Sequence, residues 1–427
     1  MAEVDVNDVV EGIGKQLKLS EDSLVPWLML LKFCIPGFLF LLFQFALFKG
    51  MAIWYRIDIL EEIAKQIKLP EDLVVFSGVC RLWRYAASKK NFRFRANVVP
   101  WLMLPPKEKG SDVRSFFSLS KGMSRQINLP DAERNKCFSS KGWLMVIYKD
   151  WSMYLLHPFS SLRIELPHIK TFHNWKALST RYVAVSFIQK FVLSTGPSLE
   201  SEDYTLVVIY GSTGKLAYFR PGFKTWIAID SCQHTYSDVI YCRGMFYAID
   251  VGGGITVIDI RSDNTVAAKR VVADLPLELV PREFWTKFYL VESAGKFLVV
   301  GRKFHYRITD YGTTAFRVVE VELSRNQNEW SPVKNLGNRA LFVGDNSSLS
   351  VQVFDNSNFK PNRIYFTEDW RELYFCRHYP EGVGRDMGIY NLQDGSIERI
   401  ETSFIHRCKC SLYHAFNPPM WVEESFQ

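Results

Sequence analysis

Most of the chain carries short runs in which apolar and polar residues alternate. From residue 115 onward these runs are about four to seven residues long, and Gly, Asn, Asp and Ser separate them. Alternation with a period of two places successive side chains on opposite faces of a strand, so each run predicts one β-strand. Clear examples are residues 143–148, 205–210, 246–249, 255–260, 297–300, 316–323 and 363–366.

About 300 residues of short strands need an architecture that limits exposed sheet edges. A β-propeller does so by repeating four-stranded sheets around a central channel, with roughly 40–50 residues per blade. The pattern therefore predicts that residues 110–422 form a β-propeller-like domain of six or seven blades. We expect the fold class to be mainly β, with a small α-helical module in front of the propeller.

A helical pattern in residues 54–95 precedes the strands. Apolar residues at one-, three- and four-residue steps predict an amphipathic helix that ends at Leu69-Pro70, because the residue before proline avoids the α conformation. Pro70 and the two acids after it are typical of a second helix start. About 30 residues cannot bury a core alone, so the apolar faces either cap the next domain or dock on another protein. These faces hold Ile59, Leu60, Ile63, Ile67, Val79, Cys80, Leu82 and Trp83.

The start of this helical pattern occurs twice in the chain. Residues 8–22 align with residues 58–72 at a constant offset of 50 positions and share nine identities. Residues 26–30 recur as residues 100–104, at an offset of 74. The first copy lacks the piece that contains Cys80 to Arg84 in the second. We interpret residues 1–26 as a truncated duplicate, and a second working module is the alternative.

A hydrophobic segment, residues 27–48, lies between the two copies. It has about the 20 residues that a membrane crossing needs, although Pro36, Gly37 and Gln44 interrupt it. Six acids precede it and basic residues follow it, a charge asymmetry that would place its C-terminal side in the cytoplasm. Two hypotheses stay open. The segment is either a transmembrane helix that anchors the chain with the propeller facing the cytoplasm, or translated non-coding sequence from a gene-model artefact.

Composition and charge narrow the class of protein. The chain has 427 residues, of which 48% are hydrophobic and 23% charged, which fits two or three globular domains. Much of the net charge of +7 lies in residues 81–95. We interpret this run as a solvated helix face and expect no nucleic-acid partner, because no nucleic-acid fold signature accompanies it. The eight cysteines form no CxxC pair, which predicts a reducing compartment, the cytoplasm or the nucleus.

No arrangement of residues in the sequence indicates catalysis, a metal or a cofactor. Walker, Gly-x-Ser-x-Gly and His-Glu-x-x-His motifs are missing, and the eight histidines are dispersed. Glu320 and Glu322 are the best local pair of acids for a glycosidase, because alternation puts both on one face of a strand. We interpret both as solvent-facing. The sequence therefore predicts a protein that is not an enzyme and that carries no cofactor or metal.

Residues 79–84, Val-Cys-Arg-Leu-Trp-Arg, resemble the Val-Cys-Lys/Arg-x-Trp-Arg ending of an F-box, and small residues follow as in that family. The order differs in one respect, since Leu69-Pro70 follows the first helix instead of leading it. The resemblance implies binding to a SKP-family adaptor, which would link the chain to a cullin ubiquitin ligase. The residues implied to contact the adaptor are Leu60, Ile63, Ile67, Leu69, Pro70, Val79, Cys80 and Trp83.

The strand-rich region also resembles a known family, over roughly residues 110–422. Several of its segments resemble, in the same order, landmarks of a plant family named domain-of-unknown-function family 295, of the KIB type. In that family an F-box precedes a kelch-like propeller that is taken to bind a substrate protein. The matching segments are residues 155–160, 164–167, 236–250, 335–344, 362–366 and 418–422.

Together these resemblances predict a substrate-recognition subunit of a cullin-type (SCF) E3 ubiquitin ligase. The helical module would bind the adaptor, and the propeller would bind a target protein that the sequence does not identify. Two alternatives stay open. One is a propeller that binds proteins but whose F-box has decayed, and the other is a carbohydrate-active propeller enzyme.

Overall fold

The computed structural model divides the chain into two units. One contains Met1–Arg95 with Phe426–Gln427, and the other contains Ala96–Ser425. The residues that the structure describes are 60–61, 81–86, 99–105, 112–129, 135–148, 150–173, 175, 187–198, 203–229, 234–272, 286–307, 310–323, 329–354, 358–369, 386–400 and 418–423.

The few described residues of the first unit are helical. Helix α6 spans Arg81–Ala86, and Leu60 and Glu61 are helical as well. Leu60, Trp83 and Ala86 are buried, whereas Tyr85 is 62% exposed. The helices of the described residues are all too short or too polar to cross a membrane. The rest of the predicted F-box-like module and residues 1–48 lie outside the described residues.

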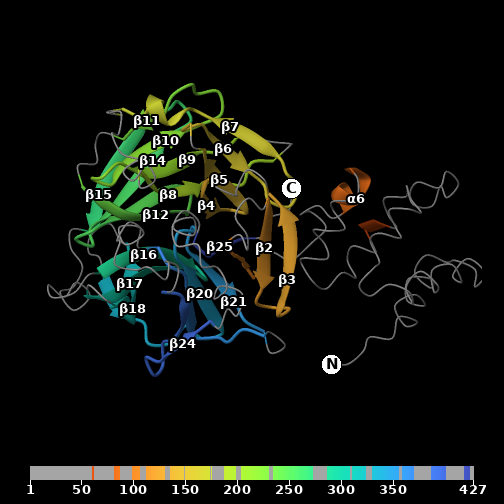
Figure 1. The fold of residues 1–427 in the computed structure, drawn as a ribbon. Helices are drawn as coiled ribbons and strands as arrows, with labels where there is room; N and C mark the ends of the chain where they lie inside the picture. The colour runs from red at the N-terminus through yellow and green to blue at the C-terminus, as the bar shows by residue number, and fades with distance from the viewer. Residues whose placement is uncertain are drawn as a thin grey trace, which may run out of the picture. The chain divides into compact units, whose positions relative to one another are not determined.

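The described strands of the second unit form six sheets arranged in a ring, which we call blades one to six (Figure 1). Blades two to five each contain four consecutive strands. Their strands are β4 (Lys136–Ser140), β5 (Trp143–Ile147), β6 (Met153–Leu156), β7 (Arg163–Leu166), β8 (Ile188–Leu193), β9 (Leu206–Tyr210), β10 (Lys215–Phe219), β11 (Ile227–Ala228), β12 (Tyr236–Cys242), β13 (Met245–Asp250), β14 (Ile255–Ile260), β15 (Val266–Val272), β16 (Thr286–Ser293), β17 (Lys296–Arg307), β18 (Asp310–Glu322) and β19 (Glu329–Pro332).

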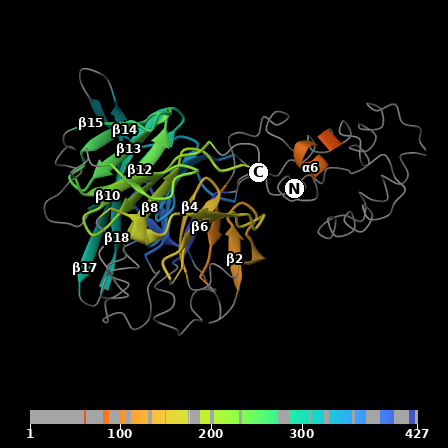
Figure 2. The same ribbon diagram turned by 90° about the horizontal axis from the view of Figure 1, so that it is seen from above.

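Neighbouring strands within blades two to five are antiparallel and follow each other in sequence, as expected for a propeller. The first hairpins of blades two, four and five turn tightly on a residue–glycine pair. Lys141-Gly142 has φ values of 52° and 80°, and Ala294-Gly295 has 52° and 82°. Positive φ at both central positions is the geometry that joins two twisted strands with a two-residue turn. A short 3-10 helix, η3 (Ile169–Thr171), follows β7, and the long β17–β18 hairpin is visible in Figure 2.

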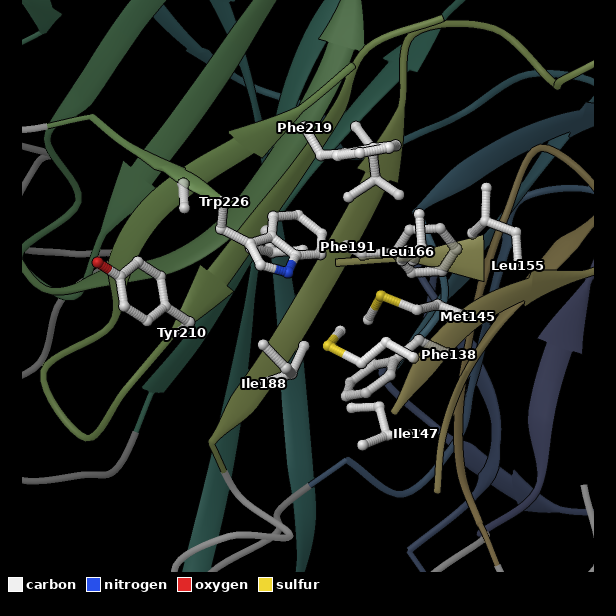
Figure 3. Packing of buried hydrophobic residues seen from close by; sticks show 14 of the residues in the cluster. Phe138, Met145, Ile147, Leu155, Leu166, Ile188, Phe191, Tyr210, Phe219 and Trp226 are labelled. Carbon is white, nitrogen blue, oxygen red and sulfur yellow. The ribbon is translucent and has the colours of Figure 1, made fainter. Parts of the chain in front are cut away.

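The core of the propeller consists of hydrophobic clusters between neighbouring blades. Alternation explains how one strand serves two clusters: Leu206, Val208 and Tyr210 of β9 pack with blade two, whereas Val207 and Ile209 pack with blade four. Figure 3 shows the cluster between blades two and three. Because both faces of such strands are buried, they hold continuous apolar runs in place of the expected alternation of apolar and polar residues.

Blade one closes the ring by joining the two ends of the propeller. Its order is β25 (Met420–Val422), β1 (Trp101–Met103), β2 (Val113–Ser118) and β3 (Met123–Asn128). Leu102 pairs with Trp421 in the antiparallel β1–β25 ladder. The propeller unit therefore starts ahead of the predicted boundary at residue 110, because β1 is needed to hold the C-terminal strand.

Blade six differs from the others in strand number and direction. Its strands are β20 (Arg339–Val343), β21 (Leu349–Gln352), β22 (Arg363–Phe366), β23 (Gly388–Asn391) and β24 (Ile397–Arg399). The order in the sheet is β21-β20-β22-β23-β24, and β20 runs parallel to β22. After β20 the chain turns back as β21, which pairs with one edge of β20. It then returns as β22, which pairs with the other edge. With this blade the described strands form six blades. Of the two expected numbers, six and seven, six is confirmed.

Candidate functional site in the polar centre of the propeller

A buried arginine, Arg302 of β17, joins blade five to blade six. Its side chain is completely buried, and each of its three nitrogens donates a hydrogen bond. Nε donates to Thr313 Oγ1 at 2.7 Å, and Nη2 donates to Asp386 Oδ2 at 2.8 Å. Nη1 donates to the Thr367 carbonyl oxygen at 2.8 Å and to Asp369 Oδ1 at 3.2 Å. The guanidinium therefore holds residues on both sides of the segment 370–385, which joins β22 to β23.

Asp369 receives two further donors from β16. Lys287 Nζ lies 2.8 Å from Asp369 Oδ2, and the Tyr289 hydroxyl donates to the same oxygen at 2.9 Å. Burial alone would raise the pKa of Asp369, but the charges of Lys287 and Arg302 outweigh it and hold that pKa below its ordinary value. This carboxylate is therefore ionised and fully paired inside the protein.

Glu368, next to Asp369, has the opposite electrostatic environment. It is fully buried, and its Oε2 accepts from the Tyr311 hydroxyl at 2.7 Å and from the Asp386 amide at 3.3 Å. Burial and, after it, the negative charge of Asp386 raise the pKa of Glu368 to about 8. We call the group formed by Lys287, Tyr289, Arg302, Tyr311, Thr313, Glu368, Asp369 and Asp386 the blade 5–6 network.

A second polar contact crosses the centre of the ring. Lys190 of β8 lies 2.8 Å from Asp238 Oδ1 of β12, and its Nζ donates to the Gly344 carbonyl oxygen at 3.1 Å. Asp238 Oδ2 accepts from the Leu290 amide at 2.7 Å. Blades three, four, five and six thus meet at one ion pair whose side chains are at most 5% exposed.

Residues 344–348, between β20 and β21, fill the centre of the ring beside this ion pair. The Ser347 amide donates to the Ser139 carbonyl oxygen at 2.8 Å, and the Ser347 and Ser140 hydroxyls lie 2.6 Å apart. Asp345, Asn346, Ser347 and Ser348 are all buried. The segment of blade six therefore bonds to blades two and three.

The charged side chains of this polar centre bond one blade to another, and the ion pairs of Lys190 and Arg302 are buried away from any solute. Its carboxylates are buried and accept hydrogen bonds from protein groups, a state that leaves ionic groups costly to expose or to rearrange. Glu320 and Glu322 lie elsewhere, on β18, and Lys296 Nζ contacts Glu320. Within the described parts of the chain, no group of three or more His, Cys, Asp or Glu side chains is arranged to hold a metal ion.

No motif or spacing in the sequence predicted the blade 5–6 network. One signal was present: Arg302 has the same strand parity as Leu298 and Val300, which pack between blades five and six, so alternation placed a charge in a buried register. Its partners Asp369 and Asp386 are 17 positions apart and belong to no regular alternation. Their meeting depends on the unusual return of the chain in blade six.

The predicted adaptor-binding residues are only partly described by the structure. Leu60 and Trp83 are buried. Ile63, Ile67, Leu69, Pro70, Val79 and Cys80 lie outside the described residues. The adaptor-binding role of all eight stays a prediction.

Comparison with known proteins identifies the propeller at family level. Residues 116–391 match the family model described as KIB1-4 beta-propeller. An Arabidopsis thaliana protein named F-box protein At2g17036 is 25% identical over 407 residues, covering 87% of this chain and 94% of the relative. F-box protein SKIP23, also from Arabidopsis thaliana, is 24% identical over 391 residues, covering 81% of this chain and 90% of the relative.

Proposed function

Because this chain belongs to the family of KIB1-4 β-propellers, we propose that it is a substrate-recognition subunit of a cullin-type (SCF) E3 ubiquitin ligase. The helical module in residues 54–95 binds a SKP-family adaptor, and the propeller binds a target protein. Such a subunit brings the target to the ligase and raises its effective concentration there. We also propose that its propeller is kelch-like and belongs to domain-of-unknown-function family 295.

One observation carries the proposal. The relatives named F-box proteins match this chain over 81% and 87% of its length, which is more than the propeller unit of residues 96–425 occupies. The similarity therefore extends into the N-terminal unit, where residues 79–84 resemble the end of an F-box. A protein with both parts fits an adaptor role better than an isolated propeller does.

The polar centre of the propeller supports a binding role without bond chemistry. The three carboxyl groups that converge there are buried and bonded to protein donors, and a segment of blade six fills the middle of the ring. We therefore propose that the target binds on the surface of the ring. We also propose the cytoplasm or the nucleus as its location, because the eight cysteines are scattered along the sequence and form no CxxC pair, which suits a reducing compartment.

The test is capture of a plant SKP-family adaptor by the purified full chain. We expect the wild-type chain to retain the adaptor and the Leu69→Ala/Pro70→Ala variant to lose at least about tenfold in affinity, because a few apolar anchors dominate such interfaces. The matched control is Met123→Ala, an exposed residue of β3 in the propeller, which should bind as the wild type does.

Adaptor capture and two further tests separate the alternative functions. A folded wild-type chain that captures no adaptor would overturn the ligase proposal and favour a propeller that only binds proteins, with a decayed F-box. Hydrolysis of an oligosaccharide panel by the full chain would favour the carbohydrate enzyme. Peptide mapping across residues 27–48 tests whether that segment is present in the protein. Extraction of the chain with and without detergent tests whether the segment acts as a membrane anchor.

A further inference from the structure

Two buried side-chain oxygens in blade six are left unpaired by the protein. Asn346 is 1% exposed and Thr367 is completely buried. Among the residues that the structure describes, neither Asn346 Oδ1 nor Thr367 Oγ1 has a hydrogen-bond partner. A polar atom in the protein interior is costly to leave unpaired, so a bound group that pairs with both oxygens would stabilise the fold.

The orientation of the Asn346 amide follows from its nitrogen. Nδ2 donates to the Ser347 carbonyl oxygen at 2.6 Å and to the Phe342 carbonyl oxygen at 3.5 Å. A flipped amide would place its oxygen against these two carbonyl oxygens, which is unfavourable. Oδ1 is therefore the atom that points away from them and needs a donor.

Both unpaired oxygens face the same spot beside Gly344. A Cβ atom built on Gly344 would collide with Thr367 Oγ1 and would lie 3.2 Å from Asn346 Oδ1. A molecule that makes a hydrogen bond to each of two oxygens can bridge them over about 5.5 Å. The two oxygens are close enough for one small molecule to contact both.

The groups around this spot select the chemistry of that molecule. Lys190 Nζ donates to the Gly344 carbonyl oxygen at 3.1 Å, and Arg302 Nη1 donates to the Thr367 carbonyl oxygen at 2.8 Å. These two positive charges would repel a metal cation, whereas an anion would face the lone pairs of Asn346 Oδ1. The Thr367 hydroxyl also carries a hydrogen that needs an acceptor. The site therefore fits a neutral molecule that both donates and accepts.

We propose that a buried water molecule binds between Asn346 Oδ1 and Thr367 Oγ1. The water donates to the amide oxygen and accepts from the hydroxyl. Asn346 belongs to the segment that fills the ring, which bonds to blade two through Ser347, and Thr367 is bonded to Arg302 of blade five. The water thus joins the ring-filling segment to the junction of blades five and six, and it acts as a structural ligand of the propeller.

A crystal structure of the wild-type full chain that resolves ordered waters tests the site directly. We expect a density peak about 2.6–3.2 Å from both oxygens. A direct hydrogen bond from Thr367 Oγ1 to Asn346 Oδ1 with no such peak would overturn the proposal. Urea unfolding in sodium, potassium and tetramethylammonium chloride at equal ionic strength should give one midpoint. A higher midpoint in either metal salt would also overturn it, because it would identify a bound cation.

Variants of Thr367 link the water to the stability of the propeller. Thr367→Val replaces the hydroxyl by a methyl group of the same shape. It should lose one long-lived water in oxygen-17 relaxation dispersion and raise the unfolding equilibrium constant at least about fivefold, because Asn346 Oδ1 is left unpaired. Thr367→Ser keeps the hydroxyl and should keep the water.

The matched control is Thr314→Val, the same change at an exposed threonine of β18, which should keep the wild-type number of long-lived waters. An equal number in Thr367→Val and the wild type would contradict the proposal. If Thr367→Val does not fold, the wild-type density at the site decides.

Discussion

Arg302 of β17 donates from Nη2 to Asp386 Oδ2 over 2.8 Å, and its side chain is completely buried. Asp386 precedes β23 of blade six, so this single bond joins two neighbouring blades. Arg302 reaches Asp369 as well, on the other side of residues 370–385. One guanidinium thus fixes both places where the chain leaves and rejoins the described part of blade six.

Replacement of Arg302 should destabilise the propeller strongly. Arg302→Met leaves Asp369 and Asp386 buried without their shared cation, and the loss of one partner of a buried ion pair costs about 3–5 kcal/mol in the free energy of unfolding. Arg302→Lys keeps the charge but loses the forked geometry, so it should fall between Arg302→Met and the wild type. Urea unfolding monitored by circular dichroism gives the three values.

The control for Arg302 is Arg125→Met, which removes an exposed arginine of β3. A surface substitution of this kind usually changes the free energy of unfolding by less than about 0.5 kcal/mol. If Arg302→Met unfolds at the same urea concentration as Arg125→Met, the network contributes little to the junction between the blades.

The regular part of this fold could be predicted from the sequence, because its strands are local. The run 205–210 alternates between two blade interfaces and became β9, and runs 246–249 and 255–260 became β13 and β14. Such strands can be recognised in a sequence from a period of two and a turn residue at the end of the run. The ring closure was harder, since β1 and β25 are distant in sequence and only three residues long each.

The polar centre could not be predicted, for a different physical reason. A lysine, an aspartate or an arginine within a strand is read as solvent-facing when its partner is unknown, and the partner of Lys190 lies on the next blade. Asn346, Ser347 and Ser348 likewise read as a turn, whereas they lie buried in the middle of the ring. These positions depend on contacts between blades that no local pattern encodes.

The ion pair of Lys190 and Asp238 should show strong coupling in a double-mutant cycle. Lys190→Met leaves the Asp238 carboxylate buried, whereas Asp238→Asn keeps an acceptor for the Leu290 amide. Each single change should cost about 3–5 kcal/mol in the free energy of unfolding. The double variant should cost less than the sum by at least about 1 kcal/mol, because residues in one buried network are not additive.

The matched control is the cycle between Lys296 and Glu320, an ion pair of similar distance. Its atoms lie 2.6 Å apart, but the lysine side chain is 60% exposed, so its coupling should be about 0–1 kcal/mol. Equal coupling in the two cycles would show that burial adds nothing to the Lys190–Asp238 pair.

A methyl group at Gly344 should disturb the segment that fills the ring. Gly344 has a φ of 154°, and a Cβ there would collide with Thr367 Oγ1. Gly344→Ala should therefore cost about 2–4 kcal/mol in the free energy of unfolding, from backbone strain and overpacking together. Thr367→Ala in the same chain should recover at least about half of the loss, since it removes the colliding oxygen.

Gly122→Ala separates the two causes of the Gly344 effect. Gly122 has a φ of 64°, and no atom lies within 4 Å of a Cβ built there, so the substitution reports backbone strain of about 1–2 kcal/mol alone. Thr367→Ala should not rescue Gly122→Ala. Failure of Thr367→Ala to rescue Gly344→Ala would mean that the backbone, and not the collision, is responsible.

Closure of the ring should depend on Trp421 of β25. This side chain is fully buried, and its ring meets Phe342 of blade six edge-on at 5.1 Å while its backbone lies opposite Leu102 of β1. Trp421→Ala removes a large contact between the first and last blades and should cost about 3–5 kcal/mol in the free energy of unfolding. Trp421→Phe keeps an aromatic ring and leaves a smaller cavity, so it should cost less than Trp421→Ala.

The best comparison for Trp421 is Trp330 of β19, which is only partly buried at the outer edge of blade five. Trp330→Ala should lower stability less than Trp421→Ala, because less of its surface leaves water and it closes no ring. Hydrogen exchange should also differ: Trp421→Ala should increase exchange in β1, whereas Trp330→Ala should leave β1 protected. Unchanged protection of β1 in Trp421→Ala would mean that the β25 backbone ladder alone holds the ring closed.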